Sequence, residues 1–188
     1  FPDNYEIGMS HLGIQILYDM FNKREDVWCE RVFAPWLDME KEMRENNIPL
    51  YALESLDPIN EFDVVGFSLQ YELSYTNILN MLQLAGVPLR SKDRHSLKNI
   101  VFAGGVCAFN PEPLADFVDF FSLGEGEDIT VEIVSLYDRA KAEGWSKDQY
   151  LAEVAKIPGV YVPALYRHEY NEDGTLFDGK TAQPWGWD

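Results

Sequence analysis

Three short apolar segments, each ending in a polar or glycine-containing turn, alternate with longer amphipathic segments along the chain. The apolar segments span residues 64–69, 100–103 and 117–123. Runs of this length are typical of strands buried on both faces of a parallel sheet. Apolar residues spaced three and four apart predict helices over residues 74–85, 128–142 and 146–155. Strands that alternate with helices predict right-handed βαβ units, and therefore an α/β fold with a doubly wound parallel sheet of the Rossmann or flavodoxin type.

The two ends of the chain have different patterns. Before the first apolar segment we expect, in chain order, a loop over residues 1–8, a helix over 10–23 with Ser10 as its N-cap, a strand over 27–33 and a helix over 36–46. After Pro158, Asp173-Gly174 predicts the turn of a β-hairpin over 166–181, followed by an aromatic tail. We therefore divide the chain into an α/β domain, residues 1–157, and a hairpin with linker, residues 158–188.

The charge and composition of the chain exclude several kinds of function. Its 188 residues include 15 Lys and Arg against 32 Asp and Glu, a net charge of −17. Such a surface repels phosphate backbones, so we expect no direct nucleic-acid binding. No apolar run reaches the roughly 18 residues that a membrane span needs, so we expect no membrane contact. Two cysteines are too few for a disulfide scaffold and, with three scattered histidines, for a self-contained metal site, which favours a cytoplasmic protein.

The turns after the predicted strands contain the candidate binding residues. Ser68 and Leu69 end the first strand, Gly104-Gly105 follows the second, and Gly124-Glu125-Gly126 follows the third. In parallel sheets the ligand crevice lies at the carboxyl ends of the strands, where glycines let a flat cofactor approach the backbone. Such glycine pairs also occur as simple tight turns. The carboxylates of Glu125 and Glu127 disfavour a phosphate ligand at the third turn, and acidic residues at a helix N-terminus also have a purely structural use.

Four motifs follow one another in a fixed order. They are Pro2-Asp-Asn-Tyr-Glu-Ile-Gly-Met-Ser-His-Leu-Gly13, Gly66-Phe-Ser-Leu69, Gly104-Gly105 with Asn110-Pro-Glu-Pro113, and Gly124-Glu-Gly-Glu127. This order resembles the N-terminal domain of cobalamin-binding-type radical SAM proteins. The resemblance implies a cobalamin-binding-like module ahead of a radical SAM barrel, with Asp3, Tyr5, Glu6 and Gly8 beside the crevice. It also implies that a first strand precedes the first motif.

Departures from that family's pattern limit what this chain holds by itself. Cobalamin domains that supply an axial ligand carry Asp-x-His-x-x-Gly, whereas Met9 stands two residues before His11 and Ile14 three after it. If cobalamin binds, we therefore expect no axial histidine, and we expect Ser68 near the displaced base of the cofactor. No Cys-x-x-x-Cys-x-x-Cys loop is present, so the resemblance places the [4Fe-4S] cluster, S-adenosylmethionine and catalysis in a downstream radical SAM domain, the expected partner.

Two other functions are compatible with these residues. A scaffold domain that has lost its ligand would use the acidic surface and the aromatic tail Trp185–Trp187 to dock a neighbour, and it predicts a crevice plugged by Tyr5, Met9 or Phe109. A flavodoxin-like electron carrier is disfavoured, because the first loop lacks the Ser/Thr-rich sequence that cradles a flavin phosphate.

Overall fold

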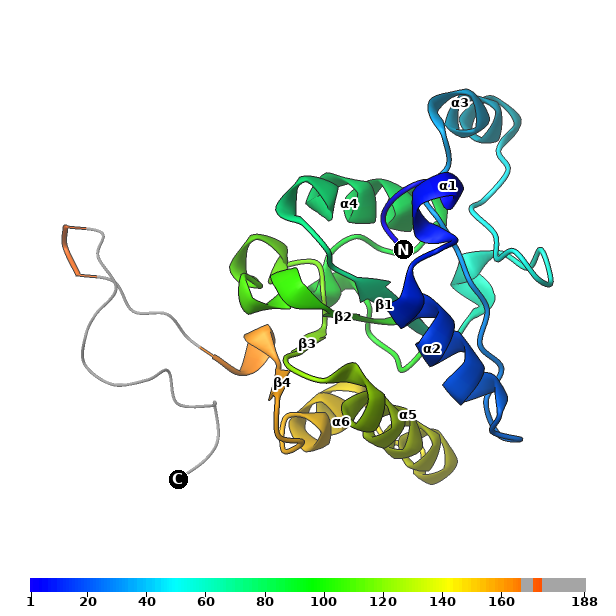
Figure 1. Cartoon of the computed structure of the whole chain (residues 1–188). Helices are drawn as coiled ribbons and strands as arrows, with labels where there is room; N and C mark the ends of the chain where they lie inside the picture. The colour runs from blue at the N-terminus through cyan, green and yellow to red at the C-terminus, as the bar shows by residue number, and fades with distance from the viewer. Residues whose placement is uncertain (167–170, 174–188) are drawn as a thin grey trace.

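Four strands form one sheet in the computed structural model, which describes residues 1–166 and 171–173 (Figure 1). They are β1 (Val64–Ser68), β2 (Ile100–Gly104), β3 (Phe120–Ser122) and β4 (Val160–Tyr161). Their order in the sheet is their order in the chain, with β1, β2 and β3 parallel and β4 antiparallel to β3. The three predicted strands and their parallel pairing are confirmed. Within the described residues the strand order does not reverse.

Helices cover both faces of the sheet (Figure 1). They are α4 (Tyr75–Leu84) on one face, and α5 (Gly126–Glu143) with α6 (Lys147–Val154) on the other. Val65 and Phe67 of β1 belong to the buried cluster that includes α4, whereas Phe120 of β3 belongs to the cluster that includes α5 and α6. Because side chains of a strand alternate between its faces, these near-continuous apolar runs supply both cores. The capping box of Ser146 and Gln149 starts α6 at the predicted place.

Three further helices precede the sheet: α1 (Tyr5–Gly8), α2 (Leu12–Asn22) and α3 (Leu37–Asn46). The predicted loop over residues 1–8 is therefore wrong in its second half, where the Asn4 side chain accepts a hydrogen bond from Ile7 N and caps a single helical turn. Helix α3 lies against α4, to which the Arg44 guanidinium of α3 is tied by a hydrogen bond to Asn80.

The predicted strand over residues 27–33 is not formed. The segment has no strand assignment, although its sequence alternates as predicted. The backbone of Cys29 bonds instead to the Asn22 side chain, and the backbone of Arg31 bonds to Glu54 and Leu53. A strand exists only when a neighbouring strand completes its hydrogen-bond ladder, and among the described residues no strand lies next to this segment.

Smaller differences concern the third strand and the C-terminal part. β3 is shorter than predicted, because the backbone N–H groups of Phe117 and Val118 bond back to Leu114 in a turn. Short 3₁₀ turns connect the main elements: η1 (Ile59–Glu61), η2 (Glu72–Ser74), η3 (Ser91–Asp93), η4 (Val106–Phe109), η5 (Glu112–Leu114) and η6 (Pro163–Leu165). The predicted hairpin over 166–181, apart from residues 166 and 171–173, and the tail Trp185–Trp187 lie outside the described residues.

Candidate cofactor-binding groove

The last rung of the three parallel strands has only small side chains. The register pairs Ser68 of β1 with Gly104 of β2, and Gly104 with Ser122 of β3. We call these three residues the end row. On the same face, the preceding rung holds the rings of Phe102 and Phe120, stacked with centroids 5.3 Å apart. The step from two large rings to three small residues leaves space between the carboxyl end of the sheet and the start of α5.

This space belongs to a groove of about 650 Å³. Its walls are α2, the segment 26–32 and helix α5 as far as Asp138, and β1 with the end row forms its floor. Five of the residues predicted from the sequence line it: Ser68, Gly104, Gly105, Gly124 and Gly126. A volume of this size is within the usual range of about 300–1,000 Å³ for small-molecule and cofactor sites.

Two of these glycines have different roles. Gly105 has a φ of +100°, and a Cβ atom there would lie 2.7 Å from the Leu69 carbonyl oxygen, so a side chain is excluded by the neighbouring turn. The same Leu69 carbonyl accepts a hydrogen bond from Cys107 N, which joins the turns after β1 and β2. Gly124, with a φ of +105°, has open space where its Cβ would be. Gly105 thus shapes the edge of the sheet, whereas Gly124 keeps the groove open.

Ser122 supplies an unpartnered polar group to the groove. The residue is 3% exposed, it lines the groove, and its buried Oγ has no hydrogen-bond partner within residues 1–166 and 171–173. The other serine and threonine hydroxyls of the groove are engaged: Ser68 Oγ accepts from Gln70 Nε2 at 2.7 Å, and Thr130 Oγ1 donates to the Gly126 carbonyl at 2.5 Å. Leaving a buried hydroxyl unpaired costs about 1–3 kcal/mol, and such groups in native proteins call for an explanation. A ligand that pairs with Ser122 would remove this cost.

The charged residues of the groove are mostly acidic. Arg31 contributes a guanidinium to the lining. Six carboxylates line the groove as well, those of Asp26, Glu30, Glu61, Asp63, Glu127 and Asp138. Burial raises the pKa of Asp138 above its usual value, and the nearby carboxylate of Asp26 acts in the same direction. This environment repels phosphate and favours ligand groups that donate hydrogen bonds or carry positive charge.

The other six predicted site residues are not brought into the groove. Asp3 accepts hydrogen bonds from Tyr71 Oη and Asn4 N, and Tyr5 packs edge-on against Phe33. The remaining four are Glu6, which is exposed, Gly8, which is buried beneath the Phe33 ring, Leu69, which is fully buried, and Glu125, which is the N-cap of α5.

Some groove residues were weakly signalled or missed by the sequence. His11, for which the sequence predicts no axial role, lines the groove, where its Nδ1 accepts a hydrogen bond from Ile14 N at 3.3 Å and caps α2. Ser122 was not predicted, although its place two residues before Gly124, at the end of a buried strand, is a usable signal. The segment 26–32 was missed as well, because its position depends on contacts far away in the sequence.

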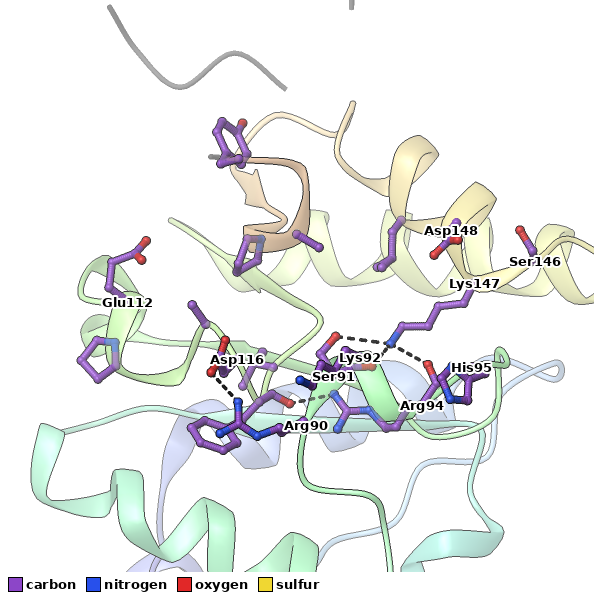
Figure 2. Close-up of a pocket in the computed structure, with 18 residues that line it drawn as sticks. Arg90, Ser91, Lys92, Arg94, His95, Glu112, Asp116, Ser146, Lys147 and Asp148 are labelled. Atoms are coloured by element: carbon purple, nitrogen blue, oxygen red, sulfur yellow. Dashed lines mark hydrogen bonds and ion pairs between the residues drawn. The ribbon is translucent and has the colours of Figure 1, made fainter. Parts of the chain in front are cut away.

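A second cavity, of about 1,010 Å³, lies near the amino end of β3 (Figure 2). Two of its lining residues, Arg94 and Lys147, bind the buried carboxylate of Asp119, with N–O distances of 3.0 and 2.6 Å. Figure 2 shows that Lys147 also reaches the loop of Ser91 and Arg94, to whose carbonyl oxygens it donates hydrogen bonds of 2.6 and 3.0 Å. Since these buried charges are paired with one another, we assign the network a structural role.

Large apolar side chains are exposed at the same carboxyl edge as the groove. Leu73 of η2 is 86% exposed and Phe109 of η4 is 73% exposed, with Val106 also exposed. The two turns are held together by the Tyr75 hydroxyl, which follows η2 and donates to the Cys107 carbonyl of η4 at 2.9 Å. Exposed apolar groups that gather at one place mark an interaction surface.

The described part of the chain contains neither a metal-ion site nor a membrane-spanning helix. Among residues 1–166 and 171–173, no group of three or more His, Cys, Asp or Glu side chains is arranged to hold a metal ion. No helix in this part of the chain is both long and apolar enough to cross a membrane.

Comparisons with known proteins relate this architecture to one family. The family model described as the N-terminal region of radical SAM proteins matches residues 13–163. An uncharacterized protein of Methanocaldococcus jannaschii is 28% identical over 138 residues, which cover 72% of this chain and 25% of that protein. The chain therefore spans about a quarter of the length of this relative. No solved structure matches the chain significantly.

Proposed function

Because this chain belongs to the family of radical SAM N-terminal domains, we propose that it is the module that holds a flat cofactor, cobalamin, at the carboxyl end of its sheet. The radical chemistry, with its [4Fe-4S] cluster and S-adenosylmethionine, is assigned to the rest of the longer polypeptide. On this proposal, residues 1–188 bind and position the cofactor but perform no chemical step.

The observation that carries the proposal is the open space above the end row, which is lined by Ser122, whose buried Oγ has no partner among the described residues. A scaffold that has lost its ligand would fill this space with side chains. Tyr5, Met9 and Phe109, which that alternative places in the crevice, do not line the groove, and all three are exposed. A groove that stays open beside an unpaired buried hydroxyl favours a ligand over a scaffold.

The residues present fit the chemistry of cobalamin in three respects. The flat base of the cofactor, when displaced from cobalt, suits a floor made of Ser68, Gly104 and Ser122, which has no bulky side chain. The primary amides around the corrin ring donate hydrogen bonds, for which the carboxylates of the groove and Ser122 Oγ are acceptors. The phosphate of the nucleotide loop has to lie away from Glu127, because like charges repel.

No axial cobalt ligand is assigned to the chain. His11 Nδ1 is already used as the acceptor for Ile14 N, and the sequence around His11 does not match the axial motif. Cobalamin, when bound, supplies cobalt-centred group-transfer or redox chemistry. The contribution of this chain is to bind the base in the groove, to orient the ring by hydrogen bonds and to exclude water with the rings of Phe102 and Phe120 below.

The exposed apolar edge suits the second part of the proposed role. Leu73, Val106 and Phe109 surround the carboxyl end of the sheet, where a cofactor held by the end row would face outwards. Since the relative is about four times longer than its matched region, further polypeptide is available to cover this edge. We infer that the radical SAM part of the same protein, a cytoplasmic enzyme on this proposal, docks here.

The proposal is tested by incubating the chain, and then the whole cluster-loaded protein, with hydroxocobalamin. Each protein is separated by gel filtration, and the visible spectrum of the protein peak is recorded. We expect co-elution with a base-off spectrum. A Gly104→Leu substitution should abolish co-elution, because the leucine side chain fills the space above the end row. The fold should tolerate the substitution, because a Cβ atom at this position makes only ordinary contacts, at 3.5 Å and beyond.

A second variant separates ligand binding from folding. Ser122→Ala removes the unpaired hydroxyl, so it should leave the free energy of unfolding unchanged or raise it, while lowering cobalamin affinity about fivefold to tenfold, the worth of one hydrogen bond. The matched control is Ser96→Ala in the loop before β2, which removes only an exposed acceptor of the Lys98 backbone N–H. It should leave cobalamin affinity unchanged and alter the free energy of unfolding by less than about 0.5 kcal/mol. Colourless protein peaks from both the chain and the whole protein would refute the cobalamin proposal.

A further inference from the structure

The cavity near the amino end of β3 is less acidic than the rest of the chain. Its described lining has four Lys and Arg side chains and three carboxylates, whereas that of the groove has one guanidinium and six carboxylates. The basic residues of the cavity are Arg90, Lys92, Arg94 and Lys147, and the acidic ones are Glu112, Asp116 and Asp148. A negatively charged group is therefore repelled less here than at the groove.

Lys92 is the basic residue of this cavity whose charge is not neutralised. Its side chain is exposed, and it makes no hydrogen bond or ion pair within residues 1–166 and 171–173. Every other Lys or Arg side chain in this part of the chain pairs with a carboxylate, apart from Arg139, which lies over the Trp145 ring. The Lys92 ammonium is therefore available to bind a further carboxylate.

The same wall of the cavity suits an aromatic ring. The Arg90 guanidinium lies over the Phe117 ring, 5.6 Å from its centroid, and the Arg90 side chain is still 46% exposed. A guanidinium is planar, so Phe117 covers one of its two faces. Leu151 and Pro163 add apolar surface to the lining. Tryptophan is the strongest cation–π partner, and its ring would cover the second face of Arg90.

The chain itself carries groups that complement this wall. Residues of η6 and Tyr166 line the cavity, and the Tyr166 ring packs against that of Tyr161 with centroids 5.0 Å apart. The chain therefore leaves η6 beside the cavity. The sequence Trp185-Gly-Trp-Asp188, which begins 19 residues after Tyr166, combines two indole rings with a carboxylate. A connection of this length reaches up to about 60 Å, more than enough to return to the cavity.

We propose that the segment Trp185–Asp188 binds in this cavity of its own chain, with an indole ring on Arg90 and the Asp188 carboxylate on Lys92. Figure 2 shows Arg90 and Lys92 close together on the loop before β2, so one short peptide contacts both. Covalent attachment gives the segment an effective concentration of the order of mM, so modest contacts are sufficient. The cavity is separate from the groove, and the inference is therefore independent of the proposed cobalamin site.

Nuclear magnetic resonance of the isotope-labelled chain, without cobalamin, tests where the segment lies. We expect nuclear Overhauser effects between the indole protons of Trp185 or Trp187 and the ring protons of Phe117. The variants Trp185→Phe and Trp187→Phe assign the two indole signals. If neither indole shows such an effect to Phe117, the proposal is wrong.

Chymotrypsin measures the docked fraction in charge variants, with mass spectrometry to follow cleavage after Trp185. Lys92→Glu replaces an attraction by a repulsion, so cleavage should be about fivefold to tenfold faster. Lys98→Glu is the matched control, because Lys98 is also exposed and precedes β2, but it binds Glu61 and does not line the cavity. This control should change the rate by less than about twofold.

A charge swap tests the pairing itself. Asp188→Lys should speed cleavage as Lys92→Glu does, and the two substitutions together should restore the original rate to within about twofold, because the ion pair is re-formed with its charges exchanged. Since the Lys92 side chain contacts no described group, its substitution should leave the urea midpoint unchanged.

Three results of the cleavage experiments would overturn the proposal. Equal rates for Lys92→Glu and Lys98→Glu would show that Lys92 does not hold the segment. A double variant that is cleaved as fast as the single variants would show that Asp188 is not the partner of Lys92. Cleavage that becomes faster on dilution of the protein would assign the segment to the cavity of a second copy, because binding within one chain does not depend on concentration.

Discussion

Replacing Asp119 by Asn should destabilise the fold far more than replacing any surface aspartate. The Asp119 carboxylate is fully buried, and its oxygens bind the Arg94 guanidinium, the Lys147 ammonium and the Val101 backbone N–H. The variant leaves two buried cations without a counter-charge. Breaking a buried ion pair in this way costs about 3–5 kcal/mol, against a total stability of about 5–15 kcal/mol for an ordinary domain.

The matched control is Asp116→Asn, three residues earlier. Its carboxylate binds the guanidinium of Arg90 at 2.6 Å, but the side chain is 70% exposed. An exposed pair contributes about 0–1 kcal/mol. Each variant thus removes a carboxylate charge that pairs with an arginine, and the two carboxylates differ in their burial.

Urea unfolding followed by far-UV circular dichroism measures both variants. With a slope of about 2 kcal/mol per M, the unfolding midpoint should fall by about 2 M for Asp119→Asn and by less than about 0.5 M for Asp116→Asn. Equal shifts in the two variants would refute the structural role assigned to the network.

Two further predictions concern groups that line the groove. Burial raises the pKa of the Cys29 thiol to about 11, and the carboxylates of Glu54 and Glu30 act in the same direction. Only about 0.1% of this thiol is therefore thiolate at pH 8. Alkylation of Cys29 by iodoacetamide, measured by mass spectrometry, should be about 100-fold slower in the folded protein than in the protein unfolded in urea. Comparable rates would contradict the raised pKa of this half-buried thiol. For Asp138, whose pKa burial raises, the ionised form disfavours folding at neutral pH. Asp138→Asn should therefore raise the thermal midpoint at pH 7, and this gain should shrink as the pH falls through the raised pKa towards about 4. A loss of stability at pH 7 would instead show that the pairing with Arg24 dominates.

The parallel core of the fold could be predicted because its signals are local. The apolar runs around Val64, Ile100 and Phe120 are long enough to be strands and too short to be helices. The capping box of Ser146 and Gln149 starts α6 through hydrogen bonds between residues only three positions apart, so it does not depend on the tertiary fold. The turns after these strands then had to meet at one edge, because parallel strands end together. Five predicted site residues line one groove for that reason.

The remaining features depend on contacts between residues distant in the sequence. The alternation over residues 27–33 is real, but a strand needs a neighbour, and the described chain places none beside it. Ser122 is an ordinary strand residue until the register aligns it with Gly104 and Ser68 and leaves its hydroxyl unpaired. Asp119, Arg94 and Lys147 look like surface charges in the sequence, and only packing buries them together. Local propensity thus determined the three parallel strands and the helices between them, whereas pairing and burial, which are properties of the assembled chain, decided that residues 27–33 form no strand, where the groove opens and which polar groups line it.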